Sequence, residues 1–173
     1  MVVMPTASQT ASVIRLSLKD VNDFPGTSSD SPLKVSTYKG MVDDKKALAI
    51  DATYRRRANP DPTYQLPIRT IANKTLTEVF DPLVSNAVAD VATAFTAYQA
   101  DPATFPAFEA KVEVNEYVAQ LYGQFKTLSN AKVLEVSTTG EIPKTLILVG
   151  ETGAGTTEDP IVSVYAATSV VYA

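Results

Sequence analysis

The stretch TLTEVFDPLVSNAVADVATAFTAYQA, residues 75–100, has a helical period, whereas the flanking segments alternate like strands, and this contrast predicts a fold that combines helices with a sheet. Thr75 and Glu78 match a capping box, and Asp81–Pro82 offers a second helix start with proline at the first helical position. Apolar residues then recur every three or four positions, which predicts an amphipathic helix. The predicted stripe is Leu83, Val84, Ala87, Val88, Val91, Phe95 and Tyr98.

A second helical pattern follows Asp101–Pro102, where the Asp-Pro pair restarts the period after a short break. Ser129–Asn130 predicts its end. Two amphipathic helices with a short proline-containing link favour an antiparallel pair, which we place in residues 73–129. The second apolar stripe is Val114, Tyr117, Val118, Leu121, Tyr122, Phe125 and Leu128.

The segments before the helix pair alternate apolar and polar residues, which is typical of half-buried strands. SVIRLSL (12–18) and LKVSTY (33–38) have this pattern. ALAIDATYRRR (47–57) also alternates, NPDP (59–62) predicts a chain reversal, and TYQLPIRTI (63–71) predicts the returning strand, with Pro67 at an edge or a bulge. We therefore expect strands and loops in residues 1–72, including a hairpin over 47–71 with an arginine-bearing end.

The segments after the helix pair, residues 131–173, also predict strands. KVLEVS (132–137) and KTLILV (144–149) precede an apolar, β-rich final segment, DPIVSVYAATSVVYA (159–173). A strand of this kind either lies inside its own sheet or pairs with another chain. The whole pattern predicts a single α+β domain over residues 1–173, with a mainly antiparallel β-sheet and a central pair of amphipathic α-helices.

A glycine-rich stretch, TLILVGETGAGTTED (145–159), matches the nucleotide-binding pattern G-x-x-x-x-G-K-[ST] at Gly150 and Gly155. Thr156 stands at the lysine position, so the positive charge of that motif is missing. Pro160 and the acids before it also oppose the helix whose N-terminus would hold a phosphate. We therefore predict a turn between strands and no bound nucleotide.

The chain contains no His and no Cys, which removes the usual zinc, iron, copper and haem ligands. Serine–histidine and cysteine–histidine nucleophiles are excluded for the same reason. We expect no enzyme activity, no catalytic residues, no metal and no cofactor. The enzyme alternative is a carboxylate-based one with Mg²⁺ or Ca²⁺, which needs acids from several segments to converge. Separately, Glu109, Glu113 and Glu116 lie on the second helix away from its apolar stripe, where metal binding is one interpretation and a solvated acidic helix face is the simpler one.

No apolar run approaches the roughly 18 residues of a membrane helix, and the first residues lack a basic leader before an apolar segment. We expect no membrane association and no signal peptide. The expected location is the virion if the protein is viral, and the cytoplasm otherwise.

The charge distribution is uneven along the chain. Residues 34–74 carry nine basic side chains against four aspartates, whereas residues 75–173 carry four lysines against twelve acids. Arginine binds phosphate through two hydrogen bonds and stacks on bases, so basic residues beside tyrosines favour RNA or single-stranded nucleic acid. The simpler alternative is that the basic and acidic charges of neighbouring elements neutralise each other within the fold. The predicted contacts are Lys45, Lys46, Tyr54, Arg55, Arg56, Arg57, Tyr64 and Arg69.

These features together favour a structural subunit that assembles with copies of itself, as a virus or phage coat (capsid) protein does. Catalytic residue types are sparse, strand-like apolar ends suit neighbours in a shell, and a basic region suits a packaged genome. The first alternative is a non-enzymatic binding or adaptor component of a larger assembly, such as a phage tail or connector protein. The carboxylate and Mg²⁺-dependent enzyme is the second alternative.

Overall fold

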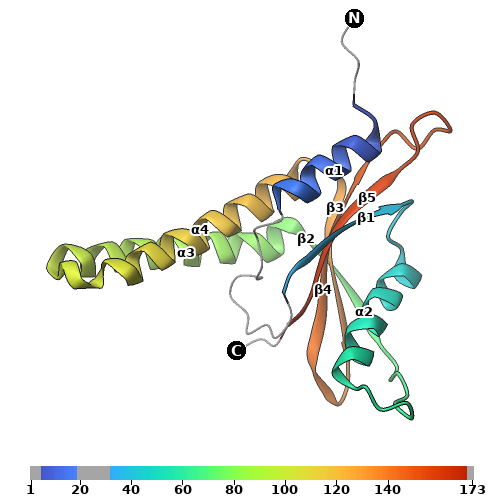
Figure 1. Ribbon diagram of the computed structural model, residues 1–173, viewed down its shortest axis with the longest axis horizontal. Coiled ribbons are helices and arrows are strands. Elements are labelled where there is room, and N and C mark those ends of the chain that lie inside the picture. The colour runs from blue at the N-terminus through green and yellow to red at the C-terminus, as the bar shows by residue number, and fades with distance from the viewer. Residues whose placement is uncertain (1–4, 19–31, 171–173) are drawn as a thin grey trace, which may run out of the picture.

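The computed structural model, which describes residues 5–18 and 32–170, contains a five-stranded antiparallel sheet with helices on both faces (Figure 1). The sheet order is β1-β5-β4-β3-β2, and every neighbouring pair is antiparallel. This confirms the predicted α+β class. The strands are β1 (Lys34–Lys39), β2 (Thr70–Thr75), β3 (Ser129–Thr138), β4 (Glu141–Thr152) and β5 (Val162–Val170).

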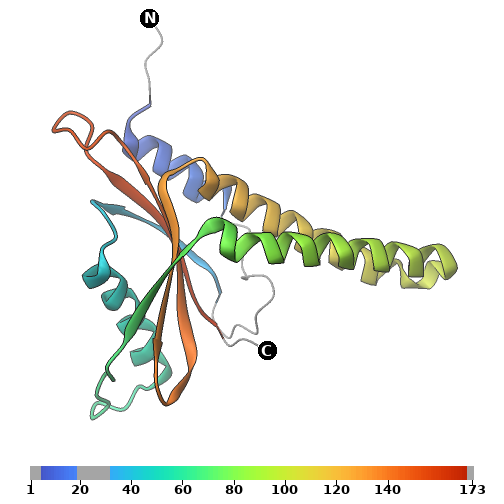
Figure 2. The same ribbon diagram turned by 180° about the vertical axis from the view of Figure 1, so that it is seen from behind.

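The helices divide between the two faces of the sheet. One face packs against α1 and the sheet-proximal ends of α3 and α4, and the opposite face packs against α2 (Figures 1 and 2). A one-turn 3₁₀ helix, η1 (Pro102–Thr104), joins α3 to α4. The helices are α1 (Ala7–Ser17), α2 (Asp44–Ala58), α3 (Leu76–Ala100) and α4 (Phe105–Lys126).

The core on the α3–α4 face is built around two phenylalanines. Phe80 of α3 and Phe125 of α4 are fully buried, and the ring of Phe80 stacks on Tyr122 with 5.0 Å between ring centroids. Burying a side chain of this size contributes about 1.5–3 kcal/mol. Val133 and Leu148, which lie opposite each other on β3 and β4, form the sheet side of this core. The hairpin is therefore anchored to the sheet only at its base.

The rest of the helical hairpin, residues 88–117, projects away from the sheet (Figure 2). At roughly 1.5 Å per residue, the 25 residues of α3 extend about 37 Å. No side chain in residues 88–117 is buried, and the exposed fractions of Val88, Phe95 and Phe105 are 56%, 45% and 44%. Phe95 and Phe105 each contact Phe108, which forms an aromatic cluster near the tip. Among the described residues, this projecting part packs against its own partner helix alone.

The start of α3 confirms the capping box and corrects the second predicted start. The hydroxyl of Thr75 accepts a hydrogen bond from the Glu78 N–H at 3.1 Å, and the Glu78 carboxylate accepts one from the Thr75 N–H at 2.6 Å. Helix α3 therefore begins at Leu76, and Pro82 lies inside it rather than at its first position. The helix loses one backbone hydrogen bond at Pro82, and the two capping bonds offset that loss. The restart predicted at Asp101–Pro102 is confirmed, because the Asp101 carboxylate caps η1 by accepting a hydrogen bond from the Ala103 N–H.

Two segments predicted as strands are helices. Residues 12–18 lie in and just after α1, which begins with a capping box between Thr6 and Gln9 and buries Ala7, Ala11, Ile14 and Leu18. Residues 47–57 lie in α2, so the hairpin predicted over 47–71 does not form. Alternation over only seven to eleven residues does not distinguish a strand from a helix here, because apolar residues in both segments also recur at the three- and four-residue spacing of a helix.

The returning strand predicted over 63–71 is mostly irregular, and β2 begins only at Thr70. The predictions of strands at 33–38, 132–137 and 144–149 are confirmed. The end of the chain resolves the choice left open by the sequence: β5 lies between β1 and β4, so its described part belongs to the interior of its own sheet.

Candidate nucleic-acid interface

Helix α2 positions most of the predicted basic cluster. The carboxylate of Asp43 caps the helix by accepting a hydrogen bond from the Lys46 N–H at 2.8 Å, so α2 begins directly after Asp43. The helix packs on the sheet through Ala47 and Ile50. Because consecutive residues on a helix point in different directions, Arg55, Arg56 and Arg57 have different surroundings.

Arg55 points into the protein and is only 5% exposed. Its Nε donates to both carboxylate oxygens of Asp51 at 2.9 and 3.0 Å, and its Nη1 donates to Glu141. Burial by itself would lower the pKa of Arg55, but the hydrogen bonds and negative charges of Asp51 and Glu141 outweigh burial and raise it. The guanidinium of Arg55 is therefore engaged by carboxylates inside the fold and is not presented to a phosphate at the surface.

Arg69 and Tyr64 belong to the same buried network. Nη1 of Arg69 donates to Oδ2 of Asp51 at 3.1 Å and to the Leu48 carbonyl at 2.9 Å. The hydroxyl of Tyr64 donates to Glu141 at 2.9 Å. A fully buried carboxylate such as Asp51 needs compensating charge and hydrogen bonds, and Arg55, Arg69 and Thr145 supply them. They stabilise the fold, and the exposed members of the predicted set remain as candidate contacts.

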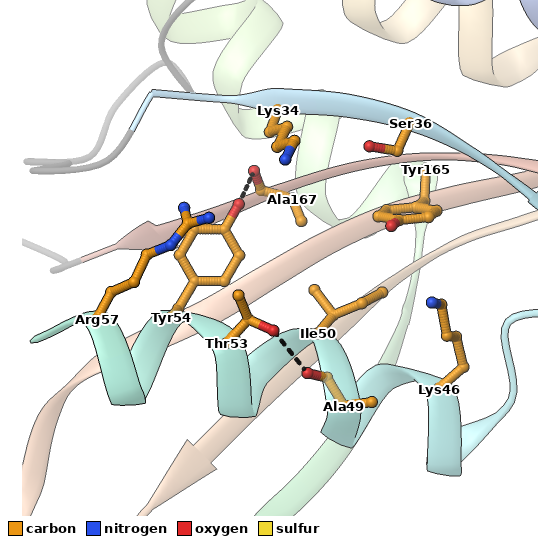
Figure 3. Close-up of a pocket in the computed structure, with 10 residues that line it drawn as sticks. All are labelled: Lys34, Ser36, Lys46, Ala49, Ile50, Thr53, Tyr54, Arg57, Tyr165 and Ala167. Carbon is orange, nitrogen blue, oxygen red and sulfur yellow. Dashed lines mark hydrogen bonds between the residues drawn. The ribbon is translucent and has the colours of Figure 1, made fainter. Parts of the chain in front are cut away.

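The remaining basic residues of α2 occupy two positions. Lys45 and Arg56 are exposed, away from the sheet. Lys46 and Arg57 line a cleft between α2 and the strands β1 and β5 (Figure 3). The ammonium group of Lys46 lies 4.4 Å from the ring centroid of Tyr38, which is cation–π distance.

The cleft has a volume of about 300 Å³, which is at the small end of ligand-binding cavities. Strand β1 contributes Lys34 and Ser36 on the face turned toward α2, and Tyr165 comes from the neighbouring strand β5. The hydroxyl of Tyr54 donates to the Ala167 carbonyl at 2.8 Å, which ties α2 to the floor of the cleft. The lining residues are Lys34, Ser36, Lys46, Ala49, Ile50, Thr53, Tyr54, Arg57, Tyr165 and Ala167.

The cleft is positively charged. Three of its lining side chains are cationic and none is acidic. Within the described part of the chain, Lys34, Lys46 and Arg57 form no ion pair with a carboxylate. Burial raises the pKa of Tyr54, while the positive charge of Arg57 beside it acts in the opposite direction. Such a cleft can hold an anion next to an aromatic ring.

Sequence reasoning missed Lys34, Ser36, Thr53 and Tyr165. Thr53 lies on α2 itself, within the segment predicted as a strand. The alternation on β1 and β5 was visible, but the pairing of Lys34 with Ala167 and of Ser36 with Tyr165 joins segments more than a hundred residues apart. Only the sheet order brings these side chains beside α2.

The glycine-rich stretch forms a turn between β4 and β5, as predicted. Gly153 and Gly155 have positive φ values of 90° and 78°. The Ala154 N–H donates to the Asp159 carboxylate at 2.9 Å, and the Gly155 N–H donates to the Asp159 carbonyl at 3.0 Å. Asp159 therefore accepts hydrogen bonds from these two backbone N–H groups of the turn, one through its carboxylate and one through its carbonyl.

The acidic face of the second helix lies on α4. Glu109, Glu113 and Glu116 are exposed on α4, and nowhere in residues 5–18 and 32–170 do three or more acidic side chains gather in a way that could hold a metal ion. Across the same residues, none of the helices is long and apolar enough to cross a membrane.

Comparisons with protein-family models, curated proteins and solved structures found no match to this chain.

Proposed function

We propose that this protein is a structural subunit that assembles with further copies of itself into a shell, as a virus or phage coat protein does, and that its α2 face contacts packaged nucleic acid. The observation that carries the proposal is the projecting part of the α3–α4 hairpin, residues 88–117.

A helical hairpin that extends beyond its sheet needs another surface. Helices gain most of their stability from packing an apolar face, and residues 88–117 have no buried side chain. Val88, Phe95 and Val114 remain 56%, 45% and 39% exposed there. Exposed apolar surface on a long, protruding element is typical of a protein–protein interface. Neighbouring subunits of a shell would supply the missing surface along its whole length.

The charges support an oriented subunit. The hairpin, residues 76–128, carries seven acidic and two basic side chains, and it lies on the opposite face of the sheet from α2 (Figure 1). Lys45, Arg56 and Arg57 are exposed on α2. A subunit with this polarity can turn its basic side toward a genome and keep its acidic hairpin away from it.

The test is size-exclusion chromatography with multi-angle light scattering, with absorbance recorded at 260 and 280 nm. The chain has no Trp and eight Tyr, so bound nucleic acid dominates the absorbance spectrum. A large, uniform particle with high 260 nm absorbance is the expected result. A small ring of fixed copy number without nucleic acid would instead indicate a connector or tail component. A monomer at all concentrations would contradict self-assembly.

A further inference from the structure

Two cavities adjoin at the end of α2, and Lys34, Tyr54 and Arg57 line both of them. We propose that this double cavity binds single-stranded nucleic acid, with one backbone phosphate between Lys34 and Arg57 and one base against Tyr165. The inference rests on the proposed contact with nucleic acid and specifies its site and its strandedness.

The shared wall places two cations where the cavities meet. In Figure 3 Lys34 descends from β1 and Arg57 extends from α2 toward the same end of the cleft, on either side of Tyr54. The hydroxyl of Tyr54 is engaged by the Ala167 carbonyl, so the charged groups are the main ligands available there. Lysine and arginine side chains converging from two elements suit a phosphate group, which accepts hydrogen bonds from both.

The first cavity, of about 300 Å³, suits one base. Tyr165 supplies an aromatic face, and Ile50 lies on the α2 side of the cleft (Figure 3). The Ser36 hydroxyl can meet a base edge, and the Thr53 hydroxyl, which donates to the Ala49 carbonyl at 3.2 Å, can still accept a hydrogen bond (Figure 3). Stacking on an aromatic side chain is tolerant of base identity, so we expect weak sequence preference.

The second cavity, of about 710 Å³, lies on the other side of the two cations. Asn59, Pro143 and Ser169 contribute to its lining. Its acidic residue, Glu141, is held by Arg55 and Tyr64, which offset its negative charge. A polymer with a phosphate flanked by two planar bases matches a cationic junction flanked by two cavities, whereas an isolated anion would use only the junction.

Duplex nucleic acid does not match this arrangement. Its bases are paired and stacked in the helix interior, so they cannot enter cavities on both sides of the phosphate without being extruded. Binding should therefore be much weaker for a duplex than for a single strand of the same length, although both carry the same backbone charge.

Fluorescence anisotropy with a fluorescein-labelled oligouridylate of about ten nucleotides tests the site, since bound single strands commonly occupy 4–16 nucleotides. The competitors are the matching duplex and inorganic polyphosphate of similar charge. The expected result is tight binding of the single strand and at least tenfold weaker binding of both competitors. Equal binding of all three would overturn the proposal, because it would indicate electrostatic attraction alone; so would no binding of the single strand.

The double variant Lys34→Gln with Arg57→Gln removes both cations of the junction, and the control Arg56→Gln changes an adjacent exposed residue outside both cavities. Lys34→Gln with Arg57→Gln should weaken single-strand binding at least tenfold and reduce the slope of log affinity against log salt by about 0.7, the loss of one phosphate contact. Arg56→Gln should change affinity less than threefold. Equal losses in both variants would overturn the assigned site.

Tyr165→Leu tests the base contact and Tyr165→Phe controls for the fold, because phenylalanine keeps the ring. Leucine should weaken binding about fivefold or more, and phenylalanine should retain it. Circular dichroism establishes that both variants are folded, and an equal loss in both would overturn a stacking role. Light scattering separates this inference from the proposed function. If a cleft variant still forms full-size particles but these contain no nucleic acid, the cleft is the nucleic-acid site and assembly does not depend on it. If the wild-type protein is a monomer that still binds the oligonucleotide, the proposed shell is contradicted and the proposed binding site is not.

Discussion

Asp51 and Arg55 form an ion pair one helical turn apart on the buried side of α2, with Nε of Arg55 2.9 Å from Oδ2 of Asp51. The side chains are 0% and 5% exposed, so both charges lie in the interior between α2 and the sheet. Thr145 of β4 donates a further hydrogen bond to Asp51 at 2.8 Å. The pair fixes how α2 sits on β4 and divides the arginine triplet into one structural and two exposed members.

Replacing Arg55 with methionine should destabilise the protein strongly. The substitution leaves the buried carboxylate of Asp51 with Arg69 as its remaining cation, so we expect a loss of about 3 kcal/mol, the lower end of the cost of removing one partner from a buried pair. Urea denaturation measures the change. The matched variant Arg56→Met alters an exposed side chain and should stay within about 0.5 kcal/mol of the wild type. Equal stability of the two variants would show that Arg55 has no structural role.

Gly150→Ala should also be destabilising, because the glycine lies under Leu128. A Cβ atom at position 150 would approach Cβ of Leu128 to 2.5 Å and its Cδ1 to 2.6 Å, so β4 or the end of α4 would have to move. We expect a loss of about 1–3 kcal/mol, typical of overpacking. The control has the opposite sign: Gly123→Ala in α4 has open space around it and should gain about 0.5–1 kcal/mol from helix propensity. Both values come from the same denaturation experiment.

Local signals in the sequence predicted the helix pair and the C-terminal strands well. The capping box at Thr75 and the Asp-Pro pair at Asp101 each use hydrogen bonds between residues close in sequence, so their effect can be predicted from the local sequence. The prediction for α2 failed because Asp51, a charged residue, occupies the buried face where a helical stripe should be apolar. Its partner, four residues later, was the available signal, since Asp–Arg at that spacing is favourable on a helix.

The cleft depended on information that no local pattern contains. Lys34 and Tyr165 lie on adjacent strands because β5 inserts between β1 and β4, an order set by the packing of the whole sheet. The sequence indicated a basic region, and the structure assigns Arg55 and Arg69 of that region to buried carboxylates. Charge alone could not distinguish side chains that face solvent from those that neutralise Asp51.

The capping carboxylate of Glu78 should make stability depend on pH in a defined direction. Hydrogen bonds from the backbone N–H and the hydroxyl of Thr75 lower the pKa of Glu78 below its ordinary value of 4.5. Because the folded pKa is depressed, this contribution is present above pH 4.5 and is lost as pH falls through the lowered pKa. The melting temperature of Glu78→Gln should therefore lie below that of the wild type at pH 7, and the gap should narrow below pH 4.5. The control is Glu113→Gln, at an exposed position in α4. If its difference in melting temperature from the wild type also narrowed below pH 4.5, the effect would not be specific to the cap.

Removing residues 162–173 should abolish folding rather than assembly alone. The deletion takes β5 from between β1 and β4, and with it Val164 and Ala166, which are fully buried. The truncated chain should show no cooperative thermal transition and poor dispersion of its NMR spectrum. A monomer that unfolds cooperatively would mean that the strand serves mainly as a contact between subunits.

The projecting hairpin permits a test that separates assembly from folding. Val88 and Val114 are exposed on α3 and α4, and glutamine is a better helix former than valine, so Val88→Gln with Val114→Gln should leave the subunit at least as stable. If neighbouring subunits cover these side chains, losing both should weaken association by about 2 kcal/mol per subunit and raise the concentration needed for assembly at least tenfold. Light scattering across a dilution series measures that concentration. The control, Ser85→Gln with Thr93→Gln, adds the same side chain at two exposed polar positions of α3 and removes no apolar surface. Unchanged assembly in the valine variant would mean that other surfaces join the subunits. Lowered thermal stability of that variant would mean that the two valines pack within their own chain more closely than their exposed fractions indicate.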